Sequence, residues 1–361
     1  MKVAFFPITS RTIDQAYAFS QYHNCPTDNV TFLSHLGSGL IGQDSSLVKN
    51  DLNTGRRILL GVPENIKGCD TLVLLNDEKM LDFPAMELLI RKALYSKMTV
   101  INACNTWGED NAVLKRIEEE YGVRLHNEDT LEMKRLEKEL LKSGKRTQIH
   151  AATVLAIGGL VEEADTFAVF AKIVTALQEY GVRVSAIGKP LISNCIGMHT
   201  YPQFFQSGKL QEEEKILRMN QYIETLIQRE HPQLLVIQMP GPIIRLSQTV
   251  PNGYGIKSYM LAQSTQLQGL ICCVPQGYSN GHLLEELDLR VQKQYGCRIL
   301  GLHFSNYSLD YQSVNGNRIY NGYYPPINQE DKNNLLLNGN HLPLVDGIVA
   351  RLKLRQFSKG T

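Results

Sequence analysis

The stretch Thr153–Pro190 constrains the fold of this chain more than any other part of the sequence. An apolar run typical of a buried strand leads into Gly158 and Gly159 and then a short loop. Apolar residues at i, i+3, i+4 and i+7 spacing follow from Asp165, which predicts an amphipathic helix. A second apolar run, Val182–Ile187, completes a β-α-β unit. In such a unit the strands are parallel, and the helix begins beside the carboxyl end of the first strand.

The loop of this unit resembles a phosphate-binding loop with parts missing. Gly159–Thr166 reads GLVEEADT, to be compared with the motif G-x-x-x-x-G-K-[ST]. The first Gly and the final Thr match. Ala164 replaces the second Gly, and Asp165 replaces the Lys that neutralises the phosphates. The substitution by Asp165 therefore reverses the charge on which phosphate binding depends.

Glu162 and Glu163 add two further carboxylates to the same loop. Two like charges at short range repel by about 1 to 4 kcal/mol, depending on the effective dielectric constant. Three interpretations remain open. The loop is a tight turn of an ordinary Rossmann-like domain with acidic residues near a helix N-terminus, a degenerate phosphate loop, or a working loop.

Composition excludes several classes of protein. The 361 residues include 37 Lys and Arg against 36 Asp and Glu, a formal net charge of +1, so no overall field points to nucleic acid or membrane. No apolar run has the length of a membrane span, and the first residues predict a strand rather than a signal peptide. The seven cysteines lack C-x-x-C spacing and predict reduced thiols in a cytoplasmic protein. The histidines do not group at zinc spacing, so we expect no metal and no cofactor.

Alternating strands and helices predict an α/β protein with two Rossmann-like domains and mainly parallel sheets. We expect residues 1–128 to form the first domain and residues 129–147, which are highly charged, to form a linking helix. Residues 148–305 form the second domain, and residues 306–361, rich in Asn, Tyr and Gly, form an irregular C-terminal extension. Leu344–Phe357 within the extension has the pattern of a last amphipathic helix.

The expected elements can be given by residue range. Those of the first domain are strands at Lys2–Pro7, Asn29–Leu33, Arg57–Leu60, Thr71–Leu75 and Thr99–Asn102, with helices at Pro84–Tyr95 and Asn111–Tyr121. Those of the second domain, after the organising unit, are strands at Gln233–Gln238, Gly269–Val274 and Arg298–Phe304, with helices at Glu212–Glu230 and Gly281–Tyr295. Leu191–Phe205 is expected to be a loop, and Arg245–Tyr259 a run of turns.

The second domain resembles the P-loop NTPase group that includes dethiobiotin synthetase. The strand, loop and helix of Val154–Thr166 resemble the phosphate loop of that group, and Ile187–Ser193 (IGKPLIS) resembles its Lys-Pro segment near the active site. Val236–Pro242 (VIQMPGP) resembles its strand ending in Glu-Gly-x-Gly, with Gln238 in place of the acid and Gly241 kept. The last part of the domain reads ICCVPQGY, then a helix, then CRILGLHF. This order resembles the strand, helix and strand that close the domains of that group.

The departures from this group indicate a loss of phosphate chemistry. Magnesium needs anionic oxygen ligands and phosphoryl transfer needs a cation on the phosphates, but the chain has Gln238 and Asp165 at these positions. We expect the crevice at the carboxyl ends of the strands to remain the ligand or partner site, and we assign no catalytic residue. The predicted ligand-binding residues of this vestigial phosphate-loop crevice are Gly158, Gly159, Glu162, Glu163, Asp165, Thr166, Lys189, Gln238 and Gly241.

The whole chain also resembles a clostridial peptide-maturation-system protein family, through the order of its Rossmann-like domain, its lysine-less phosphate-loop domain and its Asn/Tyr-rich tail. Proteins of that family are encoded beside radical-SAM maturases of Cys-rich, ribosomally made peptides. The resemblance implies a bacterial accessory protein, a pseudo-NTPase in natural-product biosynthesis that binds a precursor peptide, a maturase or a small ligand. The alternative is an active, ligase- or kinase-like enzyme that uses the same crevice with a non-standard ligand mode. His199 and Tyr201 are then candidates for acid–base work.

Overall fold

The computed structural model divides the chain into two compact units. Unit 1 contains Met1–Lys134 and Pro190–Gly197, and unit 2 contains Arg135–Lys189 and Met198–Thr361. The residues that the structure describes are 1–48, 55–77, 82–104, 112–123, 125, 152–162, 164–206, 208, 210–245, 252–276, 281–309, 321–323 and 342–353. The two units have a mainly parallel sheet each, with helices between the strands, which confirms the predicted α/β class.

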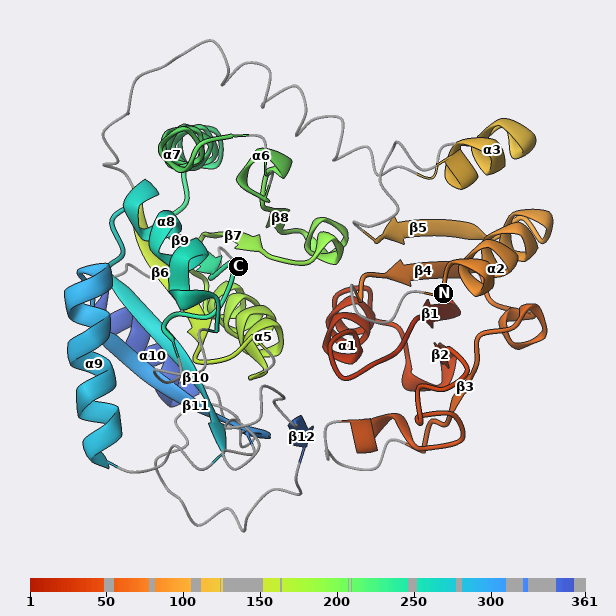
Figure 1. Cartoon of the computed structure of the whole chain (residues 1–361), viewed down its shortest axis with the longest axis horizontal. Helices are drawn as coiled ribbons and strands as arrows, with labels where there is room; N and C mark the ends of the chain where they lie inside the picture. Colours follow the sequence, from red (N-terminus) through yellow and green to blue (C-terminus); the bar gives the residue numbers. More distant parts are fainter. Residues whose placement is uncertain are drawn as a thin grey trace, which may run out of the picture. The chain divides into compact units, whose positions relative to one another are not determined.

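Unit 1 has a five-stranded parallel sheet in the order β3-β2-β1-β4-β5 (Figure 1, red to yellow). The chain starts in the middle of this sheet, moves outward on one side and then returns to fill the other side. The elements are β1 (Val3–Phe6), α1 (Ile13–Tyr22), β2 (Val30–Ser34), β3 (Ile58–Leu60), β4 (Thr71–Leu75), α2 (Phe83–Tyr95), β5 (Thr99–Ala103) and α3 (Ala112–Tyr121).

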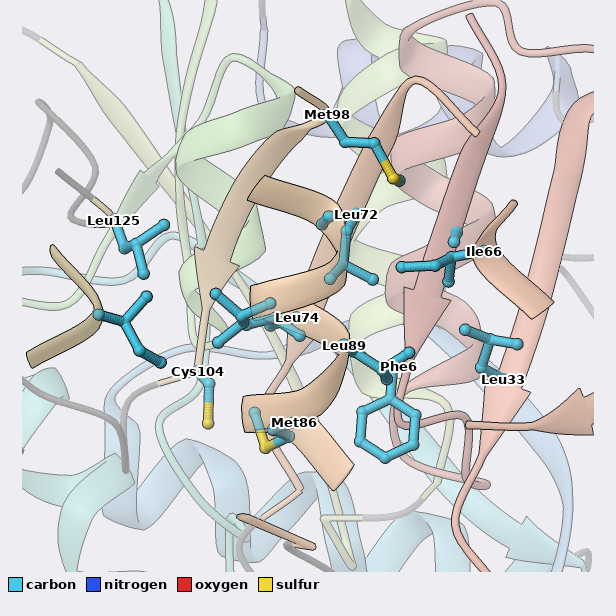
Figure 2. Close-up of a cluster of buried hydrophobic side chains, with 14 of the residues drawn as sticks. Phe6, Leu33, Ile66, Leu72, Leu74, Met86, Leu89, Met98, Cys104 and Leu125 are labelled. Carbon is cyan, nitrogen blue, oxygen red and sulfur yellow. The ribbon is translucent and has the colours of Figure 1, made fainter. Parts of the chain in front are cut away.

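Successive side chains of β1 point to opposite faces of the sheet, so the core of unit 1 has two parts, one on each face. Phe5 meets Phe19 of α1 edge to face, with ring centroids 5.5 Å apart. Phe6 belongs to the opposite cluster, where α2 contributes apolar residues at helical spacing (Figure 2). That cluster is formed by Ala4, Phe6, Leu33, Ile66, Leu72, Leu74, Met86, Leu89, Ile90, Ala93, Met98, Cys104, Leu114, Ile117 and Leu125. Each face of the sheet therefore buries its own helix layer.

A short segment from later in the chain also packs in unit 1. Pro190–Gly197, which contains the 3₁₀ turn Leu191–Ile196, contacts α1. The ring Nε2 of His23 lies 2.9 Å from the carbonyl oxygen of Cys195. Gly197 has a positive φ of 71° and lies so close to Tyr22 that a Cβ would be 2.7 Å from the tyrosine oxygen. The positive φ favours glycine at this position, whereas the nearby atom is the end of the exposed Tyr22 side chain, which is able to shift.

Unit 2 has a seven-stranded sheet in the order β12-β11-β10-β6-β9-β7-β8 (Figure 1, yellow-green to blue). All neighbouring strands are parallel except β11 and β12, which are antiparallel. The strands are β6 (Thr153–Gly159), β7 (Val184–Gly188), β8 (His199–Thr200), β9 (Leu234–Gln238), β10 (Gly269–Gln276), β11 (Ile299–Leu309) and β12 (Asn321–Tyr323).

In the described part of unit 2 the helices are α5 (Thr166–Glu179), α6 (Gln203–Gln206), α7 (Glu212–Glu230), α8 (Ile256–Ser264), α9 (Gly281–Tyr295) and α10 (Leu342–Arg351). Helix α5 packs on β6, β7 and β9, whereas α8 contacts both α7 and α9. The C-terminal helix α10 packs on α5, and the guanidinium of Arg351 donates to the carbonyl oxygen of Leu300 at 2.8 Å. The described parts of the C-terminal extension therefore belong to the body of unit 2.

Most of the elements expected from the sequence are present within a few residues of their predicted ends. The helices α7 and α9 and the strand β4 have the predicted bounds. Helix α8 is a correction, because the turns expected over Arg245–Tyr259 give way to a helix at Ile256. The short elements α6 and β8 lie in the expected loop. The linking helix predicted over 129–147 lies outside the described residues.

We predict that Leu74→Ala lowers the free energy of unfolding by about 2 to 5 kcal/mol, because Leu74 is fully buried between β4 and α2 and its loss leaves a cavity. Leu59→Ala is the matched control, since Leu59 is 38% exposed on β3 and should change stability by less than about 1 kcal/mol. Urea unfolding followed by circular dichroism measures both. Equal losses in the two variants would contradict the assignment of the unit 1 core.

Candidate functional site

The candidate site lies at the carboxyl ends of the central strands of unit 2. Strand β6 lies between β9 and β10, with Ile157 paired to Gln238 on one side and Gly158 paired to Cys272 on the other. Gly158 and Gly159 are the last residues of β6 itself, so the loop proper begins at Leu160. The residues of the predicted crevice therefore start from a strand end that is hydrogen-bonded on both edges.

Both glycines are required by close packing at this strand end. A Cβ on Gly158 would lie 2.6 Å from Cγ2 of Ile243 and 2.7 Å from Cγ of Met239. A Cβ on Gly159 would lie 2.5 Å from the carbonyl oxygen of Val161. Glycine at both positions lets the segment after β9 and the loop after β6 approach the end of the strand.

Backbone hydrogen bonds then fix these loops against the strand end. The N–H of Ile243 donates to the carbonyl oxygen of Gly159 at 3.0 Å, and the N–H of Met239 donates to that of Ile157 at 2.7 Å. The N–H of Leu160 donates to the carbonyl oxygen of Cys273 at 2.9 Å. The loop after β6 and the segment after β9 are thus held by main-chain contacts that do not depend on side-chain identity.

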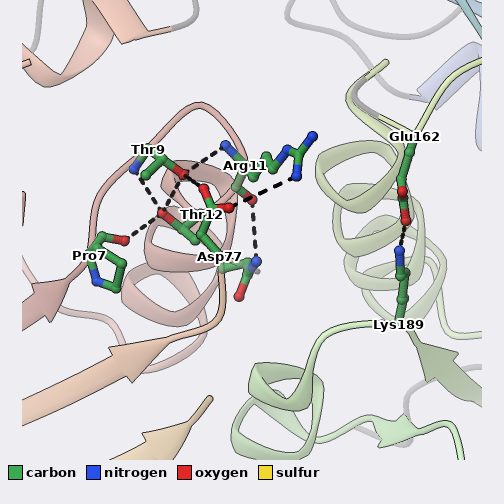
Figure 3. Close-up of polar contacts among 8 residues, drawn as sticks. Pro7, Thr9, Arg11, Thr12, Asp77, Glu162 and Lys189 are labelled. Carbon is green, nitrogen blue, oxygen red and sulfur yellow. Dashed lines mark hydrogen bonds and ion pairs between the residues drawn. The ribbon is translucent and has the colours of Figure 1, made fainter. Parts of the chain in front are cut away.

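Lys189, which follows β7, reaches the loop after β6 and forms an ion pair with Glu162 (Figure 3). The two side chains are 32% and 45% exposed, so solvent screens the pair and its contribution is at most about 1 kcal/mol. The backbone N–H of Lys189 also donates to Oε1 of Gln238 at 2.8 Å. Lys189 therefore joins the ends of β7 and β9 to the loop.

Asp165 is directed toward β11. It is the N-cap residue of α5, with a left-handed φ of 57°, but its side chain accepts no hydrogen bond from its own helix. Instead, its Oδ2 accepts a hydrogen bond from the hydroxyl of Ser305 at 2.5 Å and lies 3.4 Å from Nε2 of His303. Asp165 thus ties the start of α5 to a strand two positions from β6 in the sheet.

Gln238 and Thr166 are hydrogen-bonded to one another. Nε2 of Gln238 donates to Oγ1 of Thr166 at 3.3 Å, and the Thr166 hydroxyl donates to the carbonyl oxygen of Glu162, also at 3.3 Å. Gln238 is buried, and its backbone carbonyl accepts a hydrogen bond from the Tyr201 hydroxyl at 2.6 Å. Both ends of the Gln238 amide are therefore used within the protein.

The structure brings most of the predicted site residues into one network. Gly158, Gly159, Glu162, Asp165, Thr166, Lys189 and Gln238 lie together at this edge of the sheet. Gly241 lies in the turn after β9, where its carbonyl accepts a hydrogen bond from the Ser258 hydroxyl of α8 at 2.8 Å. Glu163 lies outside the described residues.

The two side chains expected for acid–base work are engaged in other contacts. Burial raises the pKa of Tyr201 well above its usual range, so this hydroxyl stays protonated and serves as the donor to Gln238. Nε2 of His199 lies 2.6 Å from Oε1 of Glu230, whose other oxygen accepts a hydrogen bond from Ser185 at 2.5 Å. The His199 contact, more than that of Ser185, lowers the pKa of Glu230 to about 2.

A second polar cluster lies in unit 1 and was not predicted from the sequence. It lies between β1 and β4, where the order of the sheet reverses direction and where open α/β sheets commonly bind ligands. The Thr9 hydroxyl donates to Oδ2 of the buried Asp77 at 2.6 Å, and Nη1 of Arg11 lies 3.9 Å from Oδ1 (Figure 3). The Thr12 hydroxyl donates to the carbonyl oxygen of Pro7 at 2.6 Å. These contacts join the loops that follow β1 and β4.

The cysteine thiols of unit 2 are poorly suited to nucleophilic chemistry. Burial raises the pKa of Cys272 to about 12 and is the main cause that raises the pKa of Cys297 to about 11, so neither forms a thiolate near neutral pH. Within the described ranges, no three His, Cys, Asp or Glu side chains gather closely enough to hold a metal ion. No helix in the described part of the chain is long and apolar enough to cross a membrane.

Comparison with known proteins supports the fold. Among solved structures, the chain is similar to a DUF1611 family protein from Anabaena variabilis, with a TM-score of 0.51 and 10% sequence identity over 84% of this chain and 87% of that chain. At this identity the likeness shows the fold alone. No protein-family model matches the chain, and no curated protein matches it.

We predict that Gly159→Ala lowers the free energy of unfolding by about 1 to 3 kcal/mol, because its Cβ would meet the backbone oxygen of Val161. Gly241→Ala is the matched control. The nearest atom to a Cβ there is Cβ of Lys257 at 3.8 Å, so stability should change by less than about 0.5 kcal/mol. Urea unfolding measures both variants. A Gly159→Ala protein as stable as the wild type would show that the loop is not packed as described.

We predict that Glu230→Gln destabilises the protein by about 1 to 2 kcal/mol at pH 7, because a charged hydrogen-bond acceptor is lost at a partly exposed site. The pKa of Glu230 is lowered from 4.5 to about 2 on folding. This stabilisation is therefore complete above pH 4.5 and disappears as the pH falls toward 2.

The measurement is the difference in unfolding free energy between wild type and variant at several pH values from 7 down to 3. The difference should shrink below pH 4.5. Glu179→Gln, at an exposed position on α5, provides the control and should show no such trend. A difference that is independent of pH would rule out the contribution of the Glu230 carboxylate.

Proposed function

We propose that this protein is a non-catalytic accessory protein in the maturation of a ribosomally made peptide natural product, and that unit 2 is a pseudo-NTPase. In this proposal the protein acts in the bacterial cytoplasm and binds a precursor peptide, a radical-SAM maturase or a small ligand. Its crevice keeps the strand, loop and helix of a phosphate-binding domain without the groups that bind a magnesium triphosphate. The proposal combines the sequence resemblances with the contacts of the crevice.

The observation that supports it best is that the polar groups of the crevice are bonded to each other. The ammonium of Lys189 pairs with Glu162, and the amide of Gln238 bonds both Lys189 and Thr166. In a working site, equivalent positions would present a cation to phosphates and oxygen ligands to magnesium. Here the groups close the crevice internally, which favours a structural role for the former phosphate loop.

Electrostatics supports the same proposal. Asp165 places a carboxylate at the N-terminus of α5, where a phosphate would otherwise be attracted by the helix dipole. A triphosphate would have to displace Glu162 from Lys189 and still approach Asp165, with a repulsion of about 1 to 4 kcal/mol for each pair of like charges. Weak or absent binding of ATP follows.

One contact favours the alternative, an active ligase- or kinase-like enzyme. Lys189 is 32% exposed and lies at the loop, so it would be available to a phosphate group once Glu162 turned away. The ion pair would then act as a gate whose opening supplies the cation that Asp165 has replaced. The two proposals differ in what removal of the Glu162 charge does.

The test is a calorimetric titration with Mg-ATP of the wild type, Glu162→Gln and the double variant Glu162→Gln/Asp165→Asn. We expect no binding by the wild type or by Glu162→Gln, because the Asp165 carboxylate remains. We expect weak, millimolar binding of phosphate by the double variant, since the charges of Glu162 and Asp165 no longer oppose a phosphate near Lys189 and the first N–H groups of α5. Micromolar binding by the wild type, or its appearance in Glu162→Gln, would favour the enzyme instead.

A further inference from the structure

Exposed aromatic, aliphatic and basic side chains occur on the first turn of α8, on the turn before it and at the end of the segment after β9. We call Arg245, Tyr254, Ile256, Lys257 and Tyr259 the docking face. The three apolar members are among the most exposed large hydrophobic side chains of unit 2, with exposed fractions of 60% for Tyr254, 53% for Ile256 and 45% for Tyr259. Arg245 and Lys257 are exposed as well. Exposed apolar side chains gathered in one place mark interaction sites more often than scattered ones do.

The backbone beneath the docking face is held in one conformation. Gly253, Tyr254 and Gly255 all have positive φ, of 62°, 53° and 70°. A Cβ on Gly255 would lie 2.4 Å from the carbonyl oxygen of Ile243, so only glycine permits this approach. The turn projects Tyr254 outward in a conformation that non-glycine residues seldom adopt.

The opposite side of α8 anchors this helix in unit 2. Ser258 and Leu261 are buried, and the Ser258 hydroxyl donates to the carbonyl oxygen of Gly241 at 2.8 Å. Ile256 and Tyr259 are separated by one helical turn and lie on the exposed side. The docking face is therefore pre-organised, which reduces the entropy lost when a partner binds.

The chain segment that carries the docking face contains no acidic residue. From His231 to Leu284 the sequence contains no Asp or Glu. Arg245 and Lys257 form no ion pair with any residue that the structure describes. On the helices that contact α8, arginines are matched instead by carboxylates of their own helix, namely Arg218 by Glu214 on α7 and Arg290 by Glu286 on α9. Among the described residues, the two cations of the docking face therefore have no carboxylate partner.

We propose that the docking face binds an acidic peptide segment that also carries apolar side chains. The inference rests on the proposed role in peptide maturation and specifies the chemistry of the partner. Carboxylates of the segment pair with Arg245 and Lys257, and its apolar side chains pack on Tyr254, Ile256 and Tyr259. Tyrosine and arginine are the residue types that contribute most often to the binding energy of protein interfaces.

The ratio of apolar to positively charged side chains on the docking face favours a peptide over a nucleic acid as the partner. Nucleic-acid interfaces are strongly positive, and their affinity comes largely from many phosphate contacts. The docking face has two cations beside three large apolar side chains, in a chain whose formal net charge is +1. Apolar contact area with a small number of charge pairs instead matches a peptide ligand.

The test is a selection from a random 12-residue peptide library displayed on ribosomes or phage, with the full chain immobilised as bait. Selected peptides are synthesised, and their Kd values are measured by fluorescence anisotropy. We expect the selected peptides to be rich in Asp and Glu and to contain Leu, Phe or similar residues. We expect their affinity to fall as NaCl is raised from 50 to 500 mM, because the exposed charge pairs are screened.

Variants locate the binding site. Arg245→Glu/Lys257→Glu and Tyr254→Ser/Tyr259→Ser should each weaken binding by about tenfold or more. Lys172→Glu/Lys293→Glu is the matched control. It makes the same change in net charge at exposed lysines of α5 and α9 and should leave Kd unchanged. Circular dichroism and thermal unfolding verify that every variant is folded.

Each other outcome overturns the inference in a recognisable way. Peptides that bind the docking-face variants as well as the wild type would place peptide binding elsewhere and leave the proposed function standing. A library that yields no binder would count against peptide binding itself, whereas the ATP titration tests the pseudo-NTPase proposal separately. An oligomer in light scattering that dissociates in the variants would assign the face to a second copy. Tight binding of a single-stranded oligonucleotide that displaces the peptides would assign it to nucleic acid.

Discussion

The close approach of two loops, after β6 and after β9, to the end of β6 is the constraint on which the rest of unit 2 depends. Gly158 and Gly159 leave no space for a Cβ, and the N–H groups of Met239 and Ile243 reach the carbonyls of this strand because no side chain lies between them. That approach fixes the segment after β9, which in turn carries Gly241 and the hydrogen bond to Ser258 of α8. A requirement for glycine at one strand end thus determines the position of a helix that begins almost a hundred residues later in the chain.

If unit 2 is a pseudo-NTPase, as proposed, the same packing explains how a phosphate-loop frame persists without phosphate chemistry. The frame is held by main-chain hydrogen bonds and by glycine, which do not distinguish Lys from Asp at position 165. Side chains are consequently free to change their partners. Asp165 bonds Ser305 of β11, and Lys189 pairs with Glu162. The first contact satisfies a largely buried carboxylate, which would carry a desolvation penalty of about 1 to 3 kcal/mol or more if it were unpartnered. The second is exposed and contributes at most about 1 kcal/mol.

Much of the fold could be predicted from the sequence, because the spacing of apolar residues indicates which side of a helix or strand is buried. Strands such as β4 and helices such as α7 and α9 have a clear apolar pattern, and their bounds follow from it. Helix α8 was missed for a physical reason. Ile256 and Tyr259 lie on its exposed side while Ser258 and Ser264 are buried, so polarity does not mark which side faces the core. The partners of the site residues could not be predicted from the sequence either. Asp165 and Ser305 are 140 residues apart in the chain, and Thr9 and Asp77 are 68 residues apart. Tertiary contacts of this kind leave no local pattern.

Helix α8 lacks an amphipathic pattern, and the docking face exposes apolar side chains. These two features have a common cause. A helix whose only role is to cover a core gains stability by burying apolar side chains and exposing polar ones. Helix α8 does the reverse at several positions, with buried serines that are satisfied by backbone carbonyls and exposed apolar side chains that gain nothing in the isolated protein. Places where a sequence departs from the rules of folding are commonly functional. The described acidic residues of the loop after β6 differ from the docking face in this respect, because Asp165 and Glu162 each have a partner within the protein. The exposed apolar side chains of the docking face would gain theirs only from the proposed peptide.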